Sequence, residues 1–203
     1  MSGPPYIALE GAEGCGKSTQ AALLAEALGA VLTRETGGTP IGRRLREILH
    51  DTTVTDLVDR AEALIAAADR AQHVAQIVRP ALAAGRPVVS DRSVCSTLAY
   101  QGYGRGLDLA ELRHINDWAV AGLWPTRVIL LDAPSRELTA RLHGRDLDRF
   151  EQAGPDFHDR VIAGLHAMAA ADPGRWTVVD ASGDVDAVFA RVRAAAPTFM
   201  PAP

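Results

Sequence analysis

The chain has 203 residues, with 21 Lys or Arg against 25 Asp or Glu and a formal net charge of −4 at pH 7. This length fits one α/β domain that buries roughly 70% of the surface exposed by its unfolded form. The charge balance provides no basic field for nucleic acid, and no run approaches the ~20 apolar residues of a membrane helix. Two cysteines, Cys15 and Cys95, cannot build a disulfide framework, which suits a reducing compartment. We therefore expect a cytoplasmic protein with neither a nucleic-acid nor a membrane partner.

Short apolar runs alternate with helical patterns along the chain. The apolar runs are rich in Val, Ile and Leu, as in parallel strands buried on both faces, and predict strands at 6–10, 31–34, 87–91, 128–132 and 176–180. The patterns between and after them predict helices at 17–28, 40–49, 59–84, 109–121, 135–142, 150–171 and 185–195. Alternating βα units favour a parallel sheet with helices on both faces, where ligands bind beyond the carboxyl ends of the strands.

The first strand runs into the pattern G-x-x-x-x-G-K-S, from Gly11 to Ser18, and a helical Ala/Leu run follows. Between a strand and a helix, this pattern forms a loop whose backbone N–H groups surround phosphate. Lys17 would reach the β- and γ-phosphates, and the Ser18 hydroxyl would sit on Mg²⁺. The pattern predicts that a nucleoside triphosphate is bound by Gly11, Gly14, Cys15, Gly16, Lys17, Ser18 and Thr19.

Arg34 and Arg92 each come at or after the end of a strand, and three more arginines lie within 141–149. Phosphoryl transfer needs cations around the moving group, and a planar guanidinium can hold two phosphate oxygens at once. Taken singly, these arginines have plainer interpretations as solvated residues or ion-pair partners. Because they follow a phosphate loop in this order along the chain, these arginines together favour a kinase. The solvent-facing side of a helix is the simplest interpretation of Arg43, Arg44 and Arg46.

At this point the chain resembles the thymidylate kinase family, over about residues 6–181. Besides the phosphate loop, the matching stretches are T-R-E-x-G-G-T at 33–39, R-A-E-A-L at 60–64, A-D-R-A-Q-H at 68–73, D-R at 91–92, S-T-x-A-Y-Q-G at 96–102, L-D at 131–132 and L-D-R-F-E-Q at 147–152. The resemblance implies a P-loop nucleoside monophosphate kinase fold, with a five-stranded parallel sheet and a lid segment. It implies ATP- and Mg²⁺-dependent phosphorylation of dTMP to dTDP by a homodimer. We expect one kinase domain over 1–196, with the lid at about 141–152, and a flexible Pro-rich tail at 197–203.

The resemblance also implies roles for single residues. Arg92 grips the acceptor phosphate, Arg70 faces the thymine, Ser96 and Thr97 border the base, and Tyr100 lies under the deoxyribose. Glu13 lies near the sugar 3′-hydroxyl and the metal; since it is not Arg, the chain looks like the type whose catalytic arginine is in the lid. The predicted catalytic residues are Lys17, Arg92, Arg145, Arg149 and Glu13. Substrate binding is predicted for Arg34, Ala66, Arg70, Arg92, Ser96, Thr97, Tyr100 and Gln101, and metal binding for Ser18 and Asp91.

Several departures from the family pattern gather around the acceptor nucleotide. Ala66 stands where the family has a Phe that stacks on thymine, and Thr36, Ser93 and Cys95 replace the usual Pro, Tyr and polar residue. Base–aromatic stacking is worth ~1–3 kcal/mol. The first hypothesis is an ordinary dTMP kinase in which a neighbour fills the gap left by Ala66. The second is a related kinase for another monophosphate or a phosphonate, and a third is a P-loop switch with no small acceptor.

Overall fold

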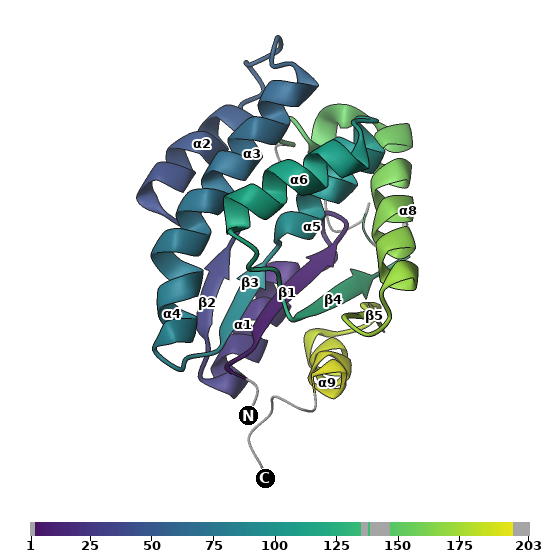
Figure 1. The fold of residues 1–203 in the computed structure, drawn as a ribbon. Helices are drawn as coiled ribbons and strands as arrows, with labels where there is room; N and C mark the ends of the chain where they lie inside the picture. The colour runs from purple at the N-terminus through teal and green to yellow at the C-terminus, as the bar shows by residue number, and fades with distance from the viewer. Residues whose placement is uncertain (1–2, 135–137, 139–146, 197–203) are drawn as a thin grey trace.

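The five predicted strands form one parallel sheet in the computed structural model, which describes residues 3–134, 138 and 147–196 (Figure 1). They are β1 (Tyr6–Gly11), β2 (Val31–Arg34), β3 (Val88–Asp91), β4 (Arg127–Asp132) and β5 (Trp176–Asp180). Their order across the sheet is β2-β3-β1-β4-β5, and all four neighbouring pairs are parallel. The strand predictions are confirmed, with ends that differ by at most one residue.

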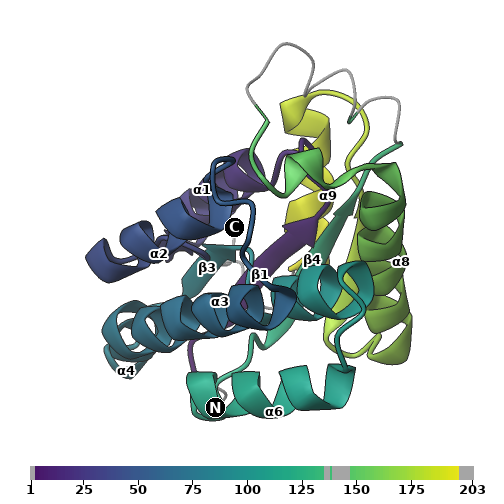
Figure 2. The ribbon, with the colours of Figure 1, turned by 90° about the horizontal axis from the view of Figure 1, so that it is seen from above.

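Helices cover both faces of the sheet, as predicted (Figure 2). One face carries α1 (Lys17–Leu28) and α9 (Val185–Ala195). The opposite face carries α3 (Asp59–His73) and α8 (Pro155–Ala171), and α6 (Leu109–Val120) packs outside α3. Side chains of a strand alternate between the two cores, since Ile129 and Leu131 pack with α1 and α9 while Val128 and Leu130 pack on the other side. The continuous apolar runs in the sequence arise from this burial on both faces.

The helices around the carboxyl ends of the strands matter most for the site. Helix α2 (Pro40–His50) packs against α3. Its first turn is capped by Thr39, whose hydroxyl accepts a hydrogen bond of 2.9 Å from the Gly42 N–H. Helix α3 continues through a π-helical turn, η1 (Val74–Val78), into α4 (Arg79–Ala83). The predicted helix at 59–84 is therefore present as one continuous helical run, made of α3, the π-helical η1 and α4.

One predicted helix begins later in the structure than expected, and another lies almost entirely outside the described residues. The helix predicted at 150–171 begins only at Pro155, because Gly154 has a φ of 87° and proline favours the first helical position. A short 3₁₀ helix, η3 (Glu151–Ala153), precedes it. The helix predicted at 135–142 lies outside the described residues except for Leu138.

The sequence did not predict the helical run after β3, which comprises α5 (Val94–Thr97) and the π-helical η2 (Leu98–Gly104). Gly102 and Gly104 argue against a helix from sequence, but here they allow close packing. A Cβ on Gly102 would clash with Leu109, and one on Gly104 would lie 2.5 Å from the Phe157 ring. Both glycines are therefore needed for contact with neighbouring helices rather than for a turn.

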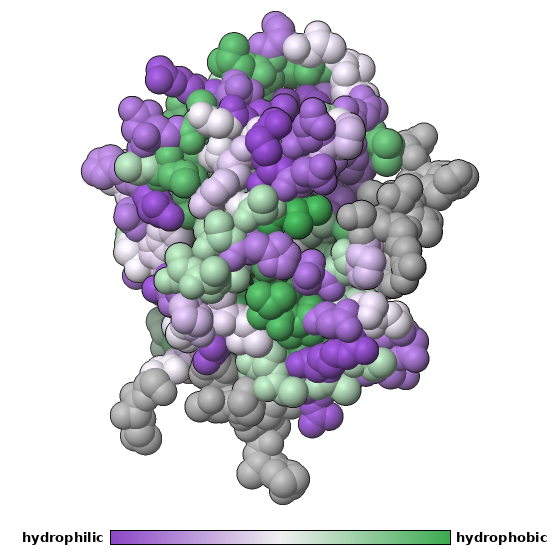
Figure 3. Space-filling model, turned by 90° about the vertical axis from the view of Figure 1, so that its right-hand side faces the viewer, coloured by the Kyte–Doolittle hydropathy of each residue, from purple (hydrophilic) through white to green (hydrophobic). Residues whose placement is uncertain are grey.

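Cys15 and Cys95 are both free and buried. In the part of the chain that the structure describes, no helix has the length and apolar character to cross a membrane. On the face that α8 presents, hydrophobic residues lie in small groups among hydrophilic ones (Figure 3).

Candidate active site

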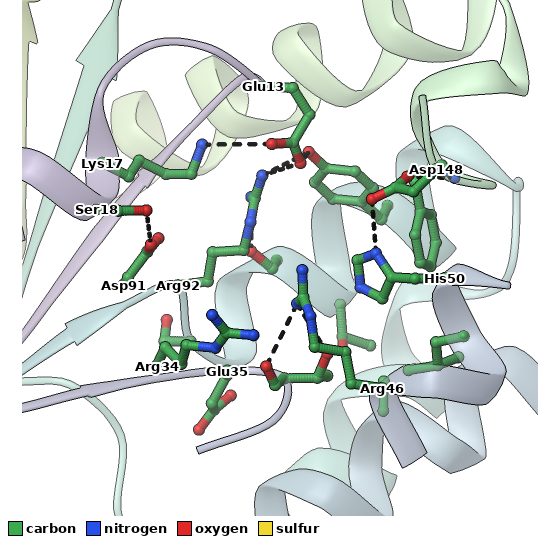
Figure 4. A pocket seen from close by; sticks show the side chains of 18 of the residues that line it. Glu13, Lys17, Ser18, Arg34, Glu35, Arg46, His50, Asp91, Arg92 and Asp148 are labelled. Carbon is green, nitrogen blue, oxygen red and sulfur yellow. Dashed lines mark hydrogen bonds and ion pairs between the residues drawn. The ribbon is translucent and has the colours of Figure 1, made fainter. Parts of the chain in front are cut away.

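A cavity of about 410 Å³ lies at the carboxyl ends of β1, β2 and β3 (Figure 4). It is lined by the loop between β1 and α1, by the ends of β2 and β3, and by residues of α2, α3, η2 and the segment before α8. The cavity brings together fifteen of the residues predicted from sequence: Glu13, Gly14, Gly16, Lys17, Ser18, Thr19, Arg34, Ala66, Arg70, Asp91, Arg92, Ser96, Thr97, Tyr100 and Gln101.

The loop between β1 and α1 has the geometry of a phosphate cradle. Gly11 has a φ of 148°, and a Cβ there would lie 2.5 Å from the Leu131 carbonyl oxygen, so only glycine fits. Helix α1 begins at Lys17 with no side-chain cap on its first N–H groups. Such groups at a helix N-terminus bind anions. The Lys17 ammonium donates a 2.7 Å hydrogen bond to the Ala12 carbonyl of the same loop, so its charge is held at the cradle.

Ser18 and Asp91 form the predicted metal-binding pair. The Ser18 hydroxyl donates a 2.5 Å hydrogen bond to Asp91 Oδ2, which connects the start of α1 to the end of β3 (Figure 4). No cluster of three His, Cys, Asp or Glu that could hold a metal occurs within 3–134, 138 and 147–196. Mg²⁺ needs none, because it prefers oxygen ligands and takes one or two protein groups together with substrate phosphates. The hydroxyl and carboxylate oxygens of this pair therefore fit Mg²⁺.

Arg92 is held in the cavity by Glu13. Its φ of 71° is unusual for a residue other than glycine, and such backbone strain gathers at functional sites. The guanidinium makes an ion pair with Glu13 and donates to the hydroxyls of Ser96, at 3.2 Å, and Tyr100, at 3.0 Å. Burial alone would raise the pKa of Glu13, but Arg92 and Lys17 outweigh it and lower this pKa to about 2. Glu13 is therefore ionised, and it orients Arg92 at neutral pH.

Arg70 reaches the cavity from α3 and is only 2% exposed. Its guanidinium donates to Glu35 Oε2 at 2.7 Å, to Asn116 Oδ1 at 2.5 Å and to the Thr97 hydroxyl at 3.0 Å. The other oxygen of Glu35 lies 2.8 Å from His73 Nδ1. Burial alone would raise the pKa of Glu35, but Arg70 and His73 lower it overall. Arg70 is thus fixed in one orientation beside Thr97, where the sequence predicts the acceptor base.

Arg34 and Arg46 point into the same cavity (Figure 4). In the described part of the chain, Arg34 has no hydrogen bond or ion pair from its side chain, and Arg46 has only two long contacts to Thr36, at 3.3 and 3.4 Å. Arg43 and Arg44 are exposed, as predicted, but the interpretation of Arg46 as a solvent-facing residue is wrong. Burial and the neighbouring Arg34 lower the pKa of Arg46. Two guanidinium groups without a carboxylate partner are well suited to an incoming anion.

Three predicted site residues do not line the cavity, and one cannot be placed. Gly11 and Cys15 belong to the phosphate loop, but both are buried and neither lines the cavity. Arg149 turns away, and its guanidinium lies 2.6 Å from Glu62 Oε2. Arg145 lies outside the described residues.

Three buried carboxylates around the site were not predicted from the sequence: Glu35, which lines the cavity and holds Arg70, and Glu10 and Glu62. Glu10, at the end of β1, accepts hydrogen bonds from the hydroxyls of Ser93 and Ser96 and from the Ser93 N–H. Burial raises the pKa of Glu10. Glu62 on α3 is 0% exposed and lies among three cationic or amide side chains. The position of Glu10 within the apolar run of β1 could have indicated a structural role near the site, because a charge in a strand buried on both faces needs dedicated partners.

A five-stranded parallel sheet, a phosphate loop at the carboxyl end of β1 and a cavity lined by several cationic side chains define the class of this protein. It is a P-loop nucleoside monophosphate kinase.

Comparisons with known proteins specify the family. The thymidylate kinase family model matches residues 9–192. A thymidylate kinase of Nitratidesulfovibrio vulgaris is 46% identical over 211 residues, covering 98% of each chain. One from Synechococcus sp. (strain JA-2-3B'a(2-13)) is 49% identical and covers 92% of this chain and 91% of that protein. The crystal structure of thymidylate kinase from Ehrlichia chaffeensis is similar with a TM-score of 0.77 and 29% identity, covering 94% and 97% of the two chains. This chain belongs to the thymidylate kinase family.

Proposed function

We propose that this protein transfers the γ-phosphoryl group of ATP to dTMP, giving ADP and dTDP. The observation that carries the proposal is that Lys17, in the phosphate loop, and Arg34, Arg46 and Arg92 face one cavity rather than two. A phosphate oxygen of dTMP attacks the γ-phosphorus, and the bond from that phosphorus to the β-phosphate oxygen breaks. Fixed cations around this transfer stabilise the charge that develops.

The residues of the phosphate loop and the cavity are each proposed to bind Mg²⁺ or a particular part of the two substrates. Gly14, Gly16, Lys17 and Thr19 hold the ATP phosphates, and Ser18 and Asp91 hold Mg²⁺. When bound, Mg²⁺ neutralises charge on the β- and γ-phosphates. The acceptor phosphate is bound by Arg34, Arg46 and Arg92, and the base lies among Ala66, Arg70, Ser96, Thr97 and Gln101, with Tyr100 under the sugar. We also propose that the protein is a homodimer in the cytoplasm and has a single kinase domain over 1–196. Its lid is proposed at about 141–152, with Arg145 acting on the phosphoryl group.

The two other hypotheses are not favoured. Relatives that are 46% and 49% identical over more than nine-tenths of this chain are thymidylate kinases, which argues against a different acceptor. A switch without an acceptor would not need Arg34 and Arg46, which line the same cavity as Lys17 and have no carboxylate partner in the described part of the chain.

The test is a coupled assay of ADP formation over a panel of nucleoside monophosphates. We expect dTMP to be the best acceptor, with kcat/KM above ~10⁴ M⁻¹s⁻¹. Replacing Arg34 or Arg46 by Met should raise KM for dTMP about 10- to 150-fold, because a charge-assisted hydrogen bond is worth ~1.5–3 kcal/mol. In these variants KM for ATP should change less than twofold. In the control Arg44→Met, on the exposed side of α2, KM for dTMP and KM for ATP should both change less than twofold. ATP hydrolysis that is indifferent to every monophosphate would contradict the proposal.

A further inference from the structure

Residues 147–153, here called the wall segment, form one side of the cavity. Asp148, Phe150 and Glu151 line it. The carboxylate of Asp148 accepts hydrogen bonds from the N–H groups of Phe150, at 2.9 Å, and Glu151, at 3.0 Å, which fixes the turn into η3. The other oxygen of Asp148 lies 2.6 Å from His50 Nδ1, at the end of α2. The wall segment therefore presents the Phe150 ring from a turn with fixed geometry.

The Phe150 ring supplies an apolar surface in a cavity that is otherwise rich in charge. It packs edge-on against Tyr100, with ring centres 5.7 Å apart, and against the His50 ring at 5.3 Å. Leu49 and Ala66 complete the apolar lining. A pyrimidine base needs flat apolar contact on its faces and polar groups at its edges. Arg70 and the neighbouring hydroxyls of the same cavity offer the polar groups, so the apolar patch around Phe150 suits a face of the base.

Arg149 packs on this ring, with its guanidinium carbon 5.0 Å from the ring centre. Its guanidinium lies 2.6 Å from Glu62 Oε2 and donates a 2.9 Å hydrogen bond to the Leu49 carbonyl, and its backbone N–H donates to the His50 carbonyl. Glu62 is 0% exposed and also accepts a 2.7 Å hydrogen bond from Gln101, which lines the cavity. One buried carboxylate thus joins the wall segment to α3 and to η2.

We propose that Phe150 contacts the base of the acceptor nucleotide, and that Arg149 and Glu62 are positioning residues that hold this ring in the cavity. Arg149 then acts through Phe150 and not on the transferring phosphoryl group, in contrast to the sequence-based expectation of a catalytic arginine. The inference rests on the proposed function, because it concerns the acceptor of that reaction.

The first test is Phe150→Leu, which keeps an apolar side chain but removes the ring. KM for dTMP should rise about 5- to 150-fold, the range spanned by base–aromatic stacking, while KM for ATP stays within about twofold and shows that the cavity is intact. Phe157→Leu is the matched control, since Phe157 also packs on Tyr100, at 6.0 Å, but does not line the cavity. Adding Ala66→Phe to Phe150→Leu should restore much of the affinity, because it supplies a ring from another wall.

The second test asks whether Arg149 acts through Phe150. Arg149→Gln should raise KM for dTMP with little change in kcat, and the double variant with Phe150→Leu should be no worse than the worse single variant. Arg160→Gln is the control, because Arg160 likewise holds a carbonyl, that of Gly104, but outside the wall segment.

The outcomes separate the two proposals. If the wild-type protein does not phosphorylate dTMP, the proposed function fails. If it does and Phe150→Leu leaves KM for dTMP unchanged, only the role of Phe150 is overturned. A large fall in kcat for Arg149→Gln at unchanged KM, or effects of the two substitutions that multiply in the double variant, would overturn the positioning role of Arg149.

Discussion

Replacing Glu13 by Gln tests whether this carboxylate holds the cations of the active site together. Glu13 makes an ion pair with Arg92, accepts a 3.1 Å hydrogen bond from the Tyr100 hydroxyl and lies 4.0 Å from the Lys17 ammonium. Gln keeps nearly the same shape and removes the charge. The free energy of unfolding should therefore report the electrostatic part of these contacts.

The magnitude follows from the pKa of Glu13, which is lowered from 4.5 to about 2. Each pKa unit corresponds to about 1.36 kcal/mol, so the charge contributes at most about 3 kcal/mol to the free energy of unfolding at neutral pH. Because the pKa is lower in the folded protein, this contribution is fully present above the unfolded value. It is lost as pH falls through the folded value of about 2.

The assay is urea unfolding of the wild type and of Glu13→Gln between pH 7 and pH 3, with Glu26→Gln as the control for an exposed carboxylate on α1. Wild type should be more stable than Glu13→Gln at pH 7, by up to about 3 kcal/mol, and this difference should fall to less than half by pH 3. The control should show differences below about 0.5 kcal/mol throughout. A difference for Glu13→Gln that stays constant from pH 7 to pH 3 would refute the reasoning.

Two further predictions concern the metal and the backbone. Asp91→Asn should raise the Mg²⁺ concentration for half-maximal activity about 10- to 100-fold, because Asp91 is proposed to bind Mg²⁺ and also orients the Ser18 hydroxyl; an unchanged Mg²⁺ titration would exclude this role. Gly42→Ala should lower the free energy of unfolding by ~1–3 kcal/mol, because the new methyl group meets the buried Asp69 carboxylate, which is fixed by the Gly37 N–H at 3.0 Å. Thermal unfolding should separate it from Gly174→Ala, where the nearest atom would be 3.6 Å away, and equal effects would contradict the packing argument.

The architecture of this protein could be predicted from sequence because its signals are local. A strand buried on both faces needs a continuous apolar run, and a phosphate loop needs glycines at fixed spacing, so each is visible within about ten residues. The run over α5 and η2 could not be predicted in this way. Its glycines at 102 and 104 are required by Leu109 and Phe157, and the second of these contacts joins residues far apart in the chain.

The inward position of Arg46 could have been predicted from the sequence. On α2 it is four residues after Gly42 and three before Leu49, and both of these are buried. Residues at these spacings share one helix face, so Arg46 belongs to the inward side of the helix and not to the side of Arg43 and Arg44. Helical periodicity alone could therefore have placed its guanidinium in the cavity.

The carboxylate partners of Arg70, Arg92 and Arg149 could not be predicted, although these three arginines were predicted as site residues. Three carboxylates each hold one of them, in the pairs Glu13–Arg92, Glu35–Arg70 and Glu62–Arg149, separated by 79, 35 and 87 residues. A sequence motif specifies which residues occur, but which carboxylate neutralises which guanidinium depends on the packing of α3, η2 and the wall segment around the sheet. That pairing also divides the arginines by how firmly they are held. Arg70, Arg92 and Arg149 are each fixed by a carboxylate, whereas Arg34 and Arg46 have no carboxylate partner in the described chain and are proposed to bind the acceptor phosphate together with Arg92.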